Sequence, residues 1–269
     1  MSGRVPILMY HAVAYAPARA TRALSVSPPA FAAQMDLLGA RGFTPVTCER
    51  LAAAWRGGAA LPERPVLITF DDGYEGVHRY ALPSLASHGF PATLFATTGW
   101  LRGPYDTGRA LDLMLDWDQL RALAAAGLEI GGHSHTHPQL DQLDDERLWF
   151  EVLRCRELLT DELGRPPVSF AYPYGYSSRR VRRTVRAAGF GVGLAVGNDL
   201  AARRQGPYAL RRVTIGRATR IAEFERLVTG QAVGRHFARD RALTKGYALI
   251  RRSRRLSRQL SRQAWGKVR

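Results

Sequence analysis

Two short segments of the chain carry residue types that can bind a metal ion and activate a water molecule. Asp71 and Asp72 end one apolar run, and His133 and His137 follow a second apolar run some sixty residues later. Catalytic zinc-type sites use three protein ligands, often histidine nitrogens and a carboxylate oxygen, and keep a position for water. We therefore predict that Asp72, His133 and His137 bind a divalent metal, which leaves Asp71 to act as a base.

The two adjacent aspartates are predicted to point in different directions. Successive residues of an extended chain face opposite ways, and a spacing of four places His133 and His137 on one face if their loop turns helically. An isolated Asp-Asp-Gly is usually a turn, so the downstream histidine pair is what favours a metal site. His135 is expected to lie outside the ligand set, because three protein ligands and water suffice.

Strand-like apolar runs alternate with helical patterns along the chain, which indicates βα units around a parallel sheet. Seven or eight such repeats favour a (β/α) barrel over an open doubly wound sheet, and barrels place their chemistry after strand ends. The predicted strands are 5–10, 43–46, 66–70, 92–96, 128–130, 168–172, 190–196 and 209–215, and the predicted helices are 28–41, 48–55, 77–87, 117–125, 144–163, 178–188 and 221–228.

The segments 69–73 (TFDDG) and 133–138 (HSHTHP) resemble the first two motifs of the polysaccharide deacetylases, carbohydrate esterase family four. The resemblance covers roughly residues 5–230 and implies an α/β fold, a distorted (β/α) barrel in a single domain. It also implies Asp71 as general base and the same three metal ligands. The family's Pro-Tyr pair is present, which implies that the Tyr174 backbone N–H helps to hold an oxyanion.

The chain departs from the family pattern at two places. The third motif, Arg-x-Pro-Tyr, here reads AYPYG at 171–175, so the arginine that orients the catalytic aspartate in the family has no counterpart there. The fifth motif, Leu-x-His, is matched only by residues 8–11 at the end of the first predicted strand. In circularly permuted members this strand comes first, which a closed barrel allows because its first and last strands are neighbours. The resemblance then implies that His11 protonates the leaving amine; the alternative is a hydrogen-bonded histidine at a strand end.

The implied function is metal-dependent removal of N-acetyl groups from a carbohydrate, whether polysaccharide, oligosaccharide or glycolipid intermediate. The substrate would be an N-acetylated sugar and the metal Zn²⁺ by default, although Co²⁺, Ni²⁺ or Fe²⁺ suit the same ligands. Two alternatives remain. One is a deformylase or cyclic amidase acting on a small amide. The other is a non-catalytic protein that binds carbohydrate or membrane, which the missing arginine favours.

The net charge of +16 is concentrated near the C-terminus. Residues 235–269 hold 12 Lys/Arg and one acid, a net +11, so the other 234 residues carry only +5. We predict a barrel over 1–234 and a basic tail over 235–269 that is helical or disordered. A basic amphipathic helix can contact an anionic membrane surface. Nucleic acid is a less favoured partner, because basic runs alone give only sequence-independent attraction.

The cellular compartment is predicted from what the chain lacks. It has no leader-like N-terminus, no run of about 18 apolar residues, and only Cys48 and Cys155, without metal or redox spacing. These features favour a cytoplasmic protein, at most peripheral to the inner membrane face.

Overall fold

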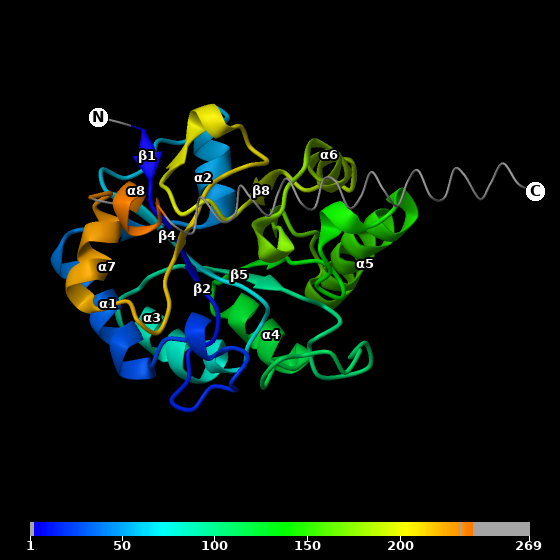
Figure 1. Cartoon of the computed structure of the whole chain (residues 1–269), viewed down its shortest axis with the longest axis horizontal. Helices are drawn as coiled ribbons and strands as arrows, with labels where there is room; N and C mark the ends of the chain where they lie inside the picture. The colour runs from blue at the N-terminus through cyan, green and yellow to red at the C-terminus, as the bar shows by residue number, and fades with distance from the viewer. Residues whose placement is uncertain (1–2, 232, 239–269) are drawn as a thin grey trace, which may run out of the picture.

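The computed structural model describes residues 3–231 and 233–238, and it places seven parallel strands side by side in one curled sheet (Figure 1). Their order across the sheet is β10-β2-β4-β5-β6-β7-β8. The strands are β2 (Ile7–Tyr10), β4 (Pro65–Phe70), β5 (Thr93–Ala96), β6 (Glu129–Gly132), β7 (Ser169–Ala171), β8 (Val192–Leu194) and β10 (Val213–Thr214). A short strand, β3 (Thr44–Pro45), adds to β4, and β1 (Arg4–Val5) pairs antiparallel with β9 (Ala201–Ala202).

The two ends of this sheet nearly meet. Leu210, just before β10, forms a single parallel bridge with Leu194 of β8, and Ala195 N–H donates to the Leu210 carbonyl over 2.8 Å. A few residues later the same segment pairs with β2 through Val213. The sheet is therefore a barrel closed at one seam by very little pairing, which confirms the predicted distorted (β/α) barrel.

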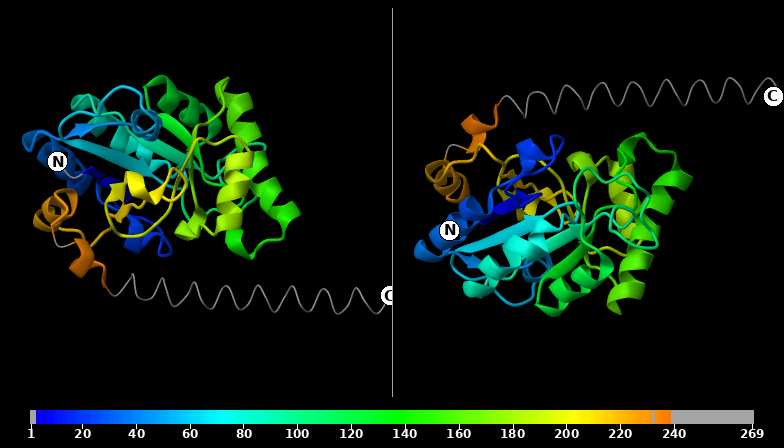
Figure 2. Two further views of the ribbon diagram at one scale, coloured as in Figure 1. Left: turned by 90° about the horizontal axis from the view of Figure 1, so that it is seen from above. Right: turned by 90° about the horizontal axis from the view of Figure 1, so that it is seen from below.

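Helices cover the outside of the sheet, as the views from above and below show (Figure 2). Side chains at Ser27, Thr47, Asp144 and Ser178 accept hydrogen bonds from the first turn of the helix that follows, and so cap the N-termini of these helices. The helices are α1 (Pro28–Ala40), α2 (Cys48–Trp55), α3 (Leu82–Ser87), α4 (Trp117–Ala125), α5 (Asp145–Leu163), α6 (Arg179–Ala187), α7 (Ile221–Val228) and α8 (Val233–His236).

Two elements differ in extent from the sequence expectation. The predicted helix 77–87 is a π-helical turn over Val77–Ala81 that passes into α3, where Pro83 occupies the first turn. Proline lacks a backbone N–H and is tolerated there. Strand β6 runs on to Gly132, two residues past the apolar run, because residues 131 and 132 are glycines that fit a crowded barrel wall.

Helix α2 closes the end of the barrel opposite the strand C-termini. Its first backbone N–H groups point at side chains that begin two strands: Glu49 N–H donates to Glu129 Oε2 at 2.8 Å, and Cys48 N–H donates to Thr93 Oγ1 at 3.2 Å. Ser169 Oγ donates to the other Glu129 oxygen at 2.6 Å. Burial raises the pKa of the Glu129 carboxyl, although these donors oppose the rise.

The two ends of the described chain lie together. Helix α7, orange in Figure 1, packs beside the blue α1, and Arg41 pairs with Glu225 of α7 at 2.5 Å. Phe237 packs into the main core. Helix α8 therefore spans the predicted domain boundary at 234/235. Residues 239–269 lie outside the described residues, so the prediction of a helical or disordered basic tail stays a prediction. Within the described part, every helix is too short or too polar to cross a membrane.

Gly131 marks how tightly the barrel interior is filled. A Cβ atom there would lie 2.6 Å from the Phe95 ring and 2.6 Å from Ser169 Oγ. A Cβ atom added to Gly39, in the last turn of α1, would lie no closer than 3.7 Å to its nearest neighbours, the side chains of His88 and Phe90.

We predict opposite effects for the same substitution at these two glycines. Gly131→Ala should lower the free energy of unfolding by about 1–3 kcal/mol because it overpacks the barrel. Gly39→Ala should raise it by roughly 0.5–1 kcal/mol because alanine favours a helix interior. Urea unfolding monitored by circular dichroism measures both, and equal stability of the two variants would contradict this description of the interior.

Candidate metal centre

The residues singled out from the sequence gather on the open rim of the barrel. Asp71 and Asp72 follow β4, His133 follows β6, Tyr174 follows β7 and His11 follows β2. Because these strands are parallel and lie within one curled sheet, their C-terminal ends face a common space.

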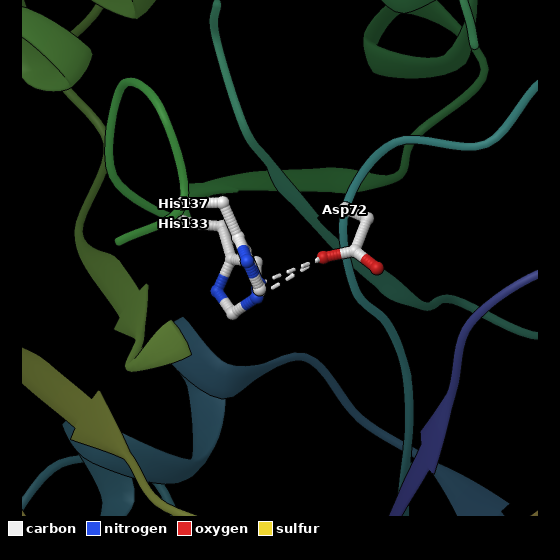
Figure 3. Close-up of side chains that lie close together, drawn as sticks. All are labelled: Asp72, His133 and His137. Atoms are coloured by element: carbon white, nitrogen blue, oxygen red, sulfur yellow. Dashed lines mark ion pairs between the residues drawn. The ribbon is translucent and has the colours of Figure 1, made fainter. Parts of the chain in front are cut away.

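Asp72, His133 and His137 form a compact set of possible metal ligands (Figure 3). Asp72 Oδ1 lies 3.3 Å from Nε2 of each histidine. Two donors about 2.1 Å from one tetrahedral ion are about 3.4 Å apart, so the spacing is that of a coordination shell. Asp72 Oδ1 is buried and has no hydrogen-bond partner among the described residues. A divalent cation between the three side chains would satisfy this oxygen.

The two imidazoles are prepared to act as ligands. The Nδ1–H of His133 donates to the Ala171 carbonyl at 2.8 Å, which leaves the Nε2 lone pair facing Asp72. Burial lowers the pKa of His137 to about 4, against the opposing charge of Asp72. For His137 this favours the neutral imidazole, the form that binds metal. Burial acts in the same direction on His133, but the charges of Asp71 and Asp72 outweigh it and raise the pKa of that ring.

The backbone at this rim differs from what the sequence spacing predicts. Asp72 has a left-handed φ of 73° rather than an extended conformation, and one oxygen of each aspartate lies within 4 Å of His133 Nε2. The loop that holds both histidines is not helical, because Ser134 and His137 have φ values of 66° and 59°. Non-glycine residues in this region are strained, and such strain is concentrated at functional sites.

Glu151 holds the loop between the two histidines in place. Its carboxylate accepts hydrogen bonds from His135 N–H (3.0 Å), Thr136 N–H (2.7 Å) and Thr136 Oγ1 (2.6 Å). The side chain is only 2 % exposed although it is an acid on α5. The sequence analysis did not identify Glu151. The signal for it was an acidic residue at helical spacing from Leu148 and Cys155, on the buried face of α5.

His135 itself turns away from the metal ligands. Its Nδ1 lies 3.0 Å from Thr98 Oγ1, and its ring packs edge-on against Phe150. The prediction that His135 stays outside the ligand set agrees with this placement.

The arginine missing from the third motif is replaced in space by Arg212. Its guanidinium is completely buried and binds Asp71 through both oxygens, with Nη1–Oδ1 at 2.5 Å and Nη2–Oδ2 at 2.7 Å. Burial would raise the pKa of Asp71, but Arg212, with a smaller contribution from His133, holds that pKa below its usual value. Arg212 lies within the predicted strand 209–215, where it and Arg211 are two adjacent charged residues in a largely apolar run, and this was the signal that could have identified it.

His11 and Tyr174 border the same space. His11 is half-buried at the end of β2, and its Nδ1 is buried without a hydrogen-bond partner among the described residues. Burial lowers the pKa of His11, while the nearby charges of Asp72 and Asp71 oppose that shift. Tyr174 has a left-handed φ of 58°, and its half-exposed ring lies 4.7 Å from the ring of His137.

Comparison with known proteins identifies relatives in sequence. The YxkH protein of Bacillus subtilis (strain 168) is 26% identical over 212 residues, which are 79% of this chain and 71% of that protein. The poly-beta-1,6-N-acetyl-D-glucosamine N-deacetylase of Escherichia coli (strain K12) is 25% identical over 246 residues, covering 78% of this chain. The match spans only 36% of the length of the Escherichia coli protein.

Solved structures show the same fold. The deacetylase PplD of Streptococcus pyogenes in complex with acetate superposes with a TM-score of 0.76 at 22% identity, over 85% of this chain and 99% of that one. IcaB from Ammonifex degensii gives a TM-score of 0.68 at 23% identity, over 85% and 98% of the two chains. The polysaccharide deacetylase family model matches residues 58–193, about half of the chain and the part that holds both aspartates and both histidines. The chain belongs to the polysaccharide deacetylase family.

Proposed function

We propose that this protein is a metal-dependent hydrolase that removes acetyl groups from N-acetylated carbohydrate. The observation that carries the proposal is the pairing of two carboxylates with separate surroundings. Asp72 faces two histidine nitrogens at 3.3 Å, while Asp71 is held through both of its oxygens by Arg212. One carboxylate is thus available for a metal and its neighbour for proton transfer.

Zinc is the metal we propose, held by Asp72, His133 and His137; cobalt, nickel and iron suit the same donors. Such a metal, when bound, lowers the pKa of a water molecule and polarises the acetyl carbonyl. The protein's part is to orient the ligands, which it does through the Ala171 carbonyl and Glu151.

Proton transfer is assigned to the residues around the metal site. Asp71 Oδ2 is 3.9 Å from His133 Nε2, so the carboxylate borders the ligand set and can take the proton of the attacking water. The Tyr174 backbone N–H donates to the oxyanion, a contact that can lower a barrier by roughly 3–4 kcal/mol. His11 donates a proton to the departing sugar amine.

The substrate class follows from the relatives and from the site together. One relative is named as a deacetylase of poly-beta-1,6-N-acetyl-D-glucosamine, and another, from Listeria monocytogenes, as a peptidoglycan-N-acetylglucosamine deacetylase. We propose N-acetylhexosamine chains as substrates here. Release of acetate from such chains, measured beside formamido sugars and cyclic amides and lost on chelation, tests this directly.

Substituting the two aspartates should separate catalysis from metal binding. Asp71→Asn should lower the rate of acetate release by about 10²–10⁴-fold, because a general base is removed, while the bound metal is retained. Asp72→Asn should lose the metal itself. Metal content by mass spectrometry and acetate release measure the two effects, and a fully active Asp71→Asn protein would exclude the proposed mechanism.

Arg212 should control the pH dependence of the reaction. Arg212 depresses the pKa of Asp71, so Arg212→Lys, which keeps the charge but loses the two-point contact, should raise that pKa. The base is then protonated at a higher pH, and the acidic limb of the rate profile should move to higher pH. We expect kcat/KM to fall about 10- to 100-fold at neutral pH. An unchanged profile would show that Arg212 does not act through Asp71.

Glu151 should affect metal affinity without touching the metal. Glu151→Leu leaves the loop amides of His135 and Thr136 without their acceptor, and we expect metal affinity to fall by about 10- to 100-fold. Glu151→Gln keeps an acceptor and should behave almost as the unmodified protein. Glu157→Leu, on the exposed side of the same helix, is the matched control. Competition with a chelating dye measures affinity; equal values for Glu151→Leu and Glu157→Leu would contradict the assignment.

A further inference from the structure

One stretch of the described chain concentrates positive charge. Residues 179–212 hold nine arginines and one acid, Asp199, a net +8, whereas the rest of residues 1–234 carries a net −3. The small net charge of residues 1–234 therefore conceals a strongly basic region. Arg212 binds Asp71, and the other eight arginines lie outside the proposed catalytic mechanism.

Four of these arginines form a stripe along α6, the helix that packs between α5 and β8 (Figure 1). They recur at spacings of three and four and so share one side of the helix: Arg179, Arg182, Arg183 and Arg186. On the other side, Val181 and Val185 are completely buried and pack in one cluster with Phe190. This packing fixes the helix orientation and holds the arginine stripe on the outer surface of the protein.

A groove of about 530 Å³ runs along the arginine stripe. The four arginines form one wall, and residues 205–208 form the other. Eight described residues line the groove, and none of them is an acid. A volume of this size accommodates a small organic ligand. Guanidinium groups without carboxylates beside them favour an anionic one.

The wall opposite the arginines is held by hydrogen bonds to the barrel. Gly193 N–H donates to the Pro207 carbonyl at 2.8 Å, and the Tyr208 hydroxyl donates to the Phe190 carbonyl at 2.9 Å. Pro207 and Tyr208 therefore supply a preformed and partly apolar surface. A groove whose two walls are already fixed loses little conformational entropy when a ligand binds.

Arg182 has a buried donor that a ligand in the groove could satisfy. Its Nε is buried and has no hydrogen-bond partner among the described residues. The Nε of Arg180 is also without a partner, but that guanidinium lies outside the groove and donates to Asp145 and to the Leu143 carbonyl. A buried N–H group without an acceptor costs free energy, which a bound anion would recover.

We propose that this groove binds the diphosphate group of a small ligand, at a site separate from the metal centre. Arg179 and Arg186 are seven residues apart, about 10 Å along the helix axis, so the stripe is longer than one phosphate and suits two that are linked. Each planar guanidinium can donate to two phosphate oxygens at once. Pro207 and Tyr208 would contact the apolar or planar group that the diphosphate carries. The proposal does not depend on the function proposed above.

Removing charge from the arginine stripe should weaken the binding of inorganic diphosphate. For Arg182→Gln/Arg183→Gln we expect Kd, measured by calorimetric titration, to rise roughly 10- to 100-fold because charge-assisted hydrogen bonds are lost. Arg50→Gln/Arg220→Gln removes the same charge from two exposed positions outside the groove and is the matched control. Arg183→Gln alone, at an exposed position, should raise Kd about 3- to 30-fold and serves if the double variant is unstable. An equal loss in both double variants would reflect general charge attraction and would overturn the proposal.

Related ligands identify what the diphosphate carries. Adenosine diphosphate and farnesyl diphosphate are titrated beside inorganic diphosphate and monophosphate. Tighter binding of the first indicates a nucleotide, tighter binding of the second a lipid carrier, and equal binding of all three diphosphates the diphosphate group alone; each result supports the site. Monophosphate that binds as tightly as diphosphate would contradict it.

A diphosphate can also chelate a metal ion, so the titration is repeated after metal removal with a chelator. We expect the affinity for diphosphate to be retained and to remain sensitive to Arg182→Gln/Arg183→Gln. Affinity that disappears with the metal and ignores the arginine substitutions would place the anion at the metal centre and overturn the proposal.

Discussion

The buried pair between Arg212 and Asp71 is the interaction on which the site depends most. Arg212 lies between Leu210, which bridges to β8, and Val213, which pairs with β2, so it enters the interior at the weakest seam of the barrel. Its two hydrogen bonds to Asp71 tie this seam to β4. Removing one partner of such a buried pair leaves an uncompensated charge and typically costs about 3–5 kcal/mol. Barrel closure and orientation of the proposed base therefore depend on the same contact.

The ligand set depends on backbone conformations that its own residues do not favour. Asp72, Ser134, His137 and Tyr174 all have positive φ values, and each follows the end of a strand. Hydrogen bonds from beyond the loops hold this geometry, above all the Ala171 carbonyl on His133 and the Glu151 carboxylate on the loop amides. These contacts from β7 and from the long helix α5 compensate the strain.

Strand β2 lies where the two ends of the described chain come together in the barrel. Strand β2 lies between β10 and β4, and α7 packs beside α1, so residues from both ends of the described chain form one continuous part of the barrel. His11, at the end of β2, thereby stands next to the strand that carries Asp71, with Asp71 N–H donating to the Tyr10 carbonyl at 2.9 Å. His11 therefore lies beside the strand end that carries both aspartates, although 60 positions separate it from Asp71 in the sequence.

Much of the fold and part of the site were determined by the sequence alone. Helices α4 and α7 have the predicted bounds, and both aspartates and both histidines were identified, because periodicity and short motifs are local properties. Only the tertiary structure decided which arginine supports Asp71 and which acid supports the histidine loop. Arg212 lies 141 positions from Asp71, and such a pairing is created by barrel closure rather than by any nearby pattern. The left-handed turns at Asp72 and His137 likewise follow from contacts that form only when separate strand ends meet.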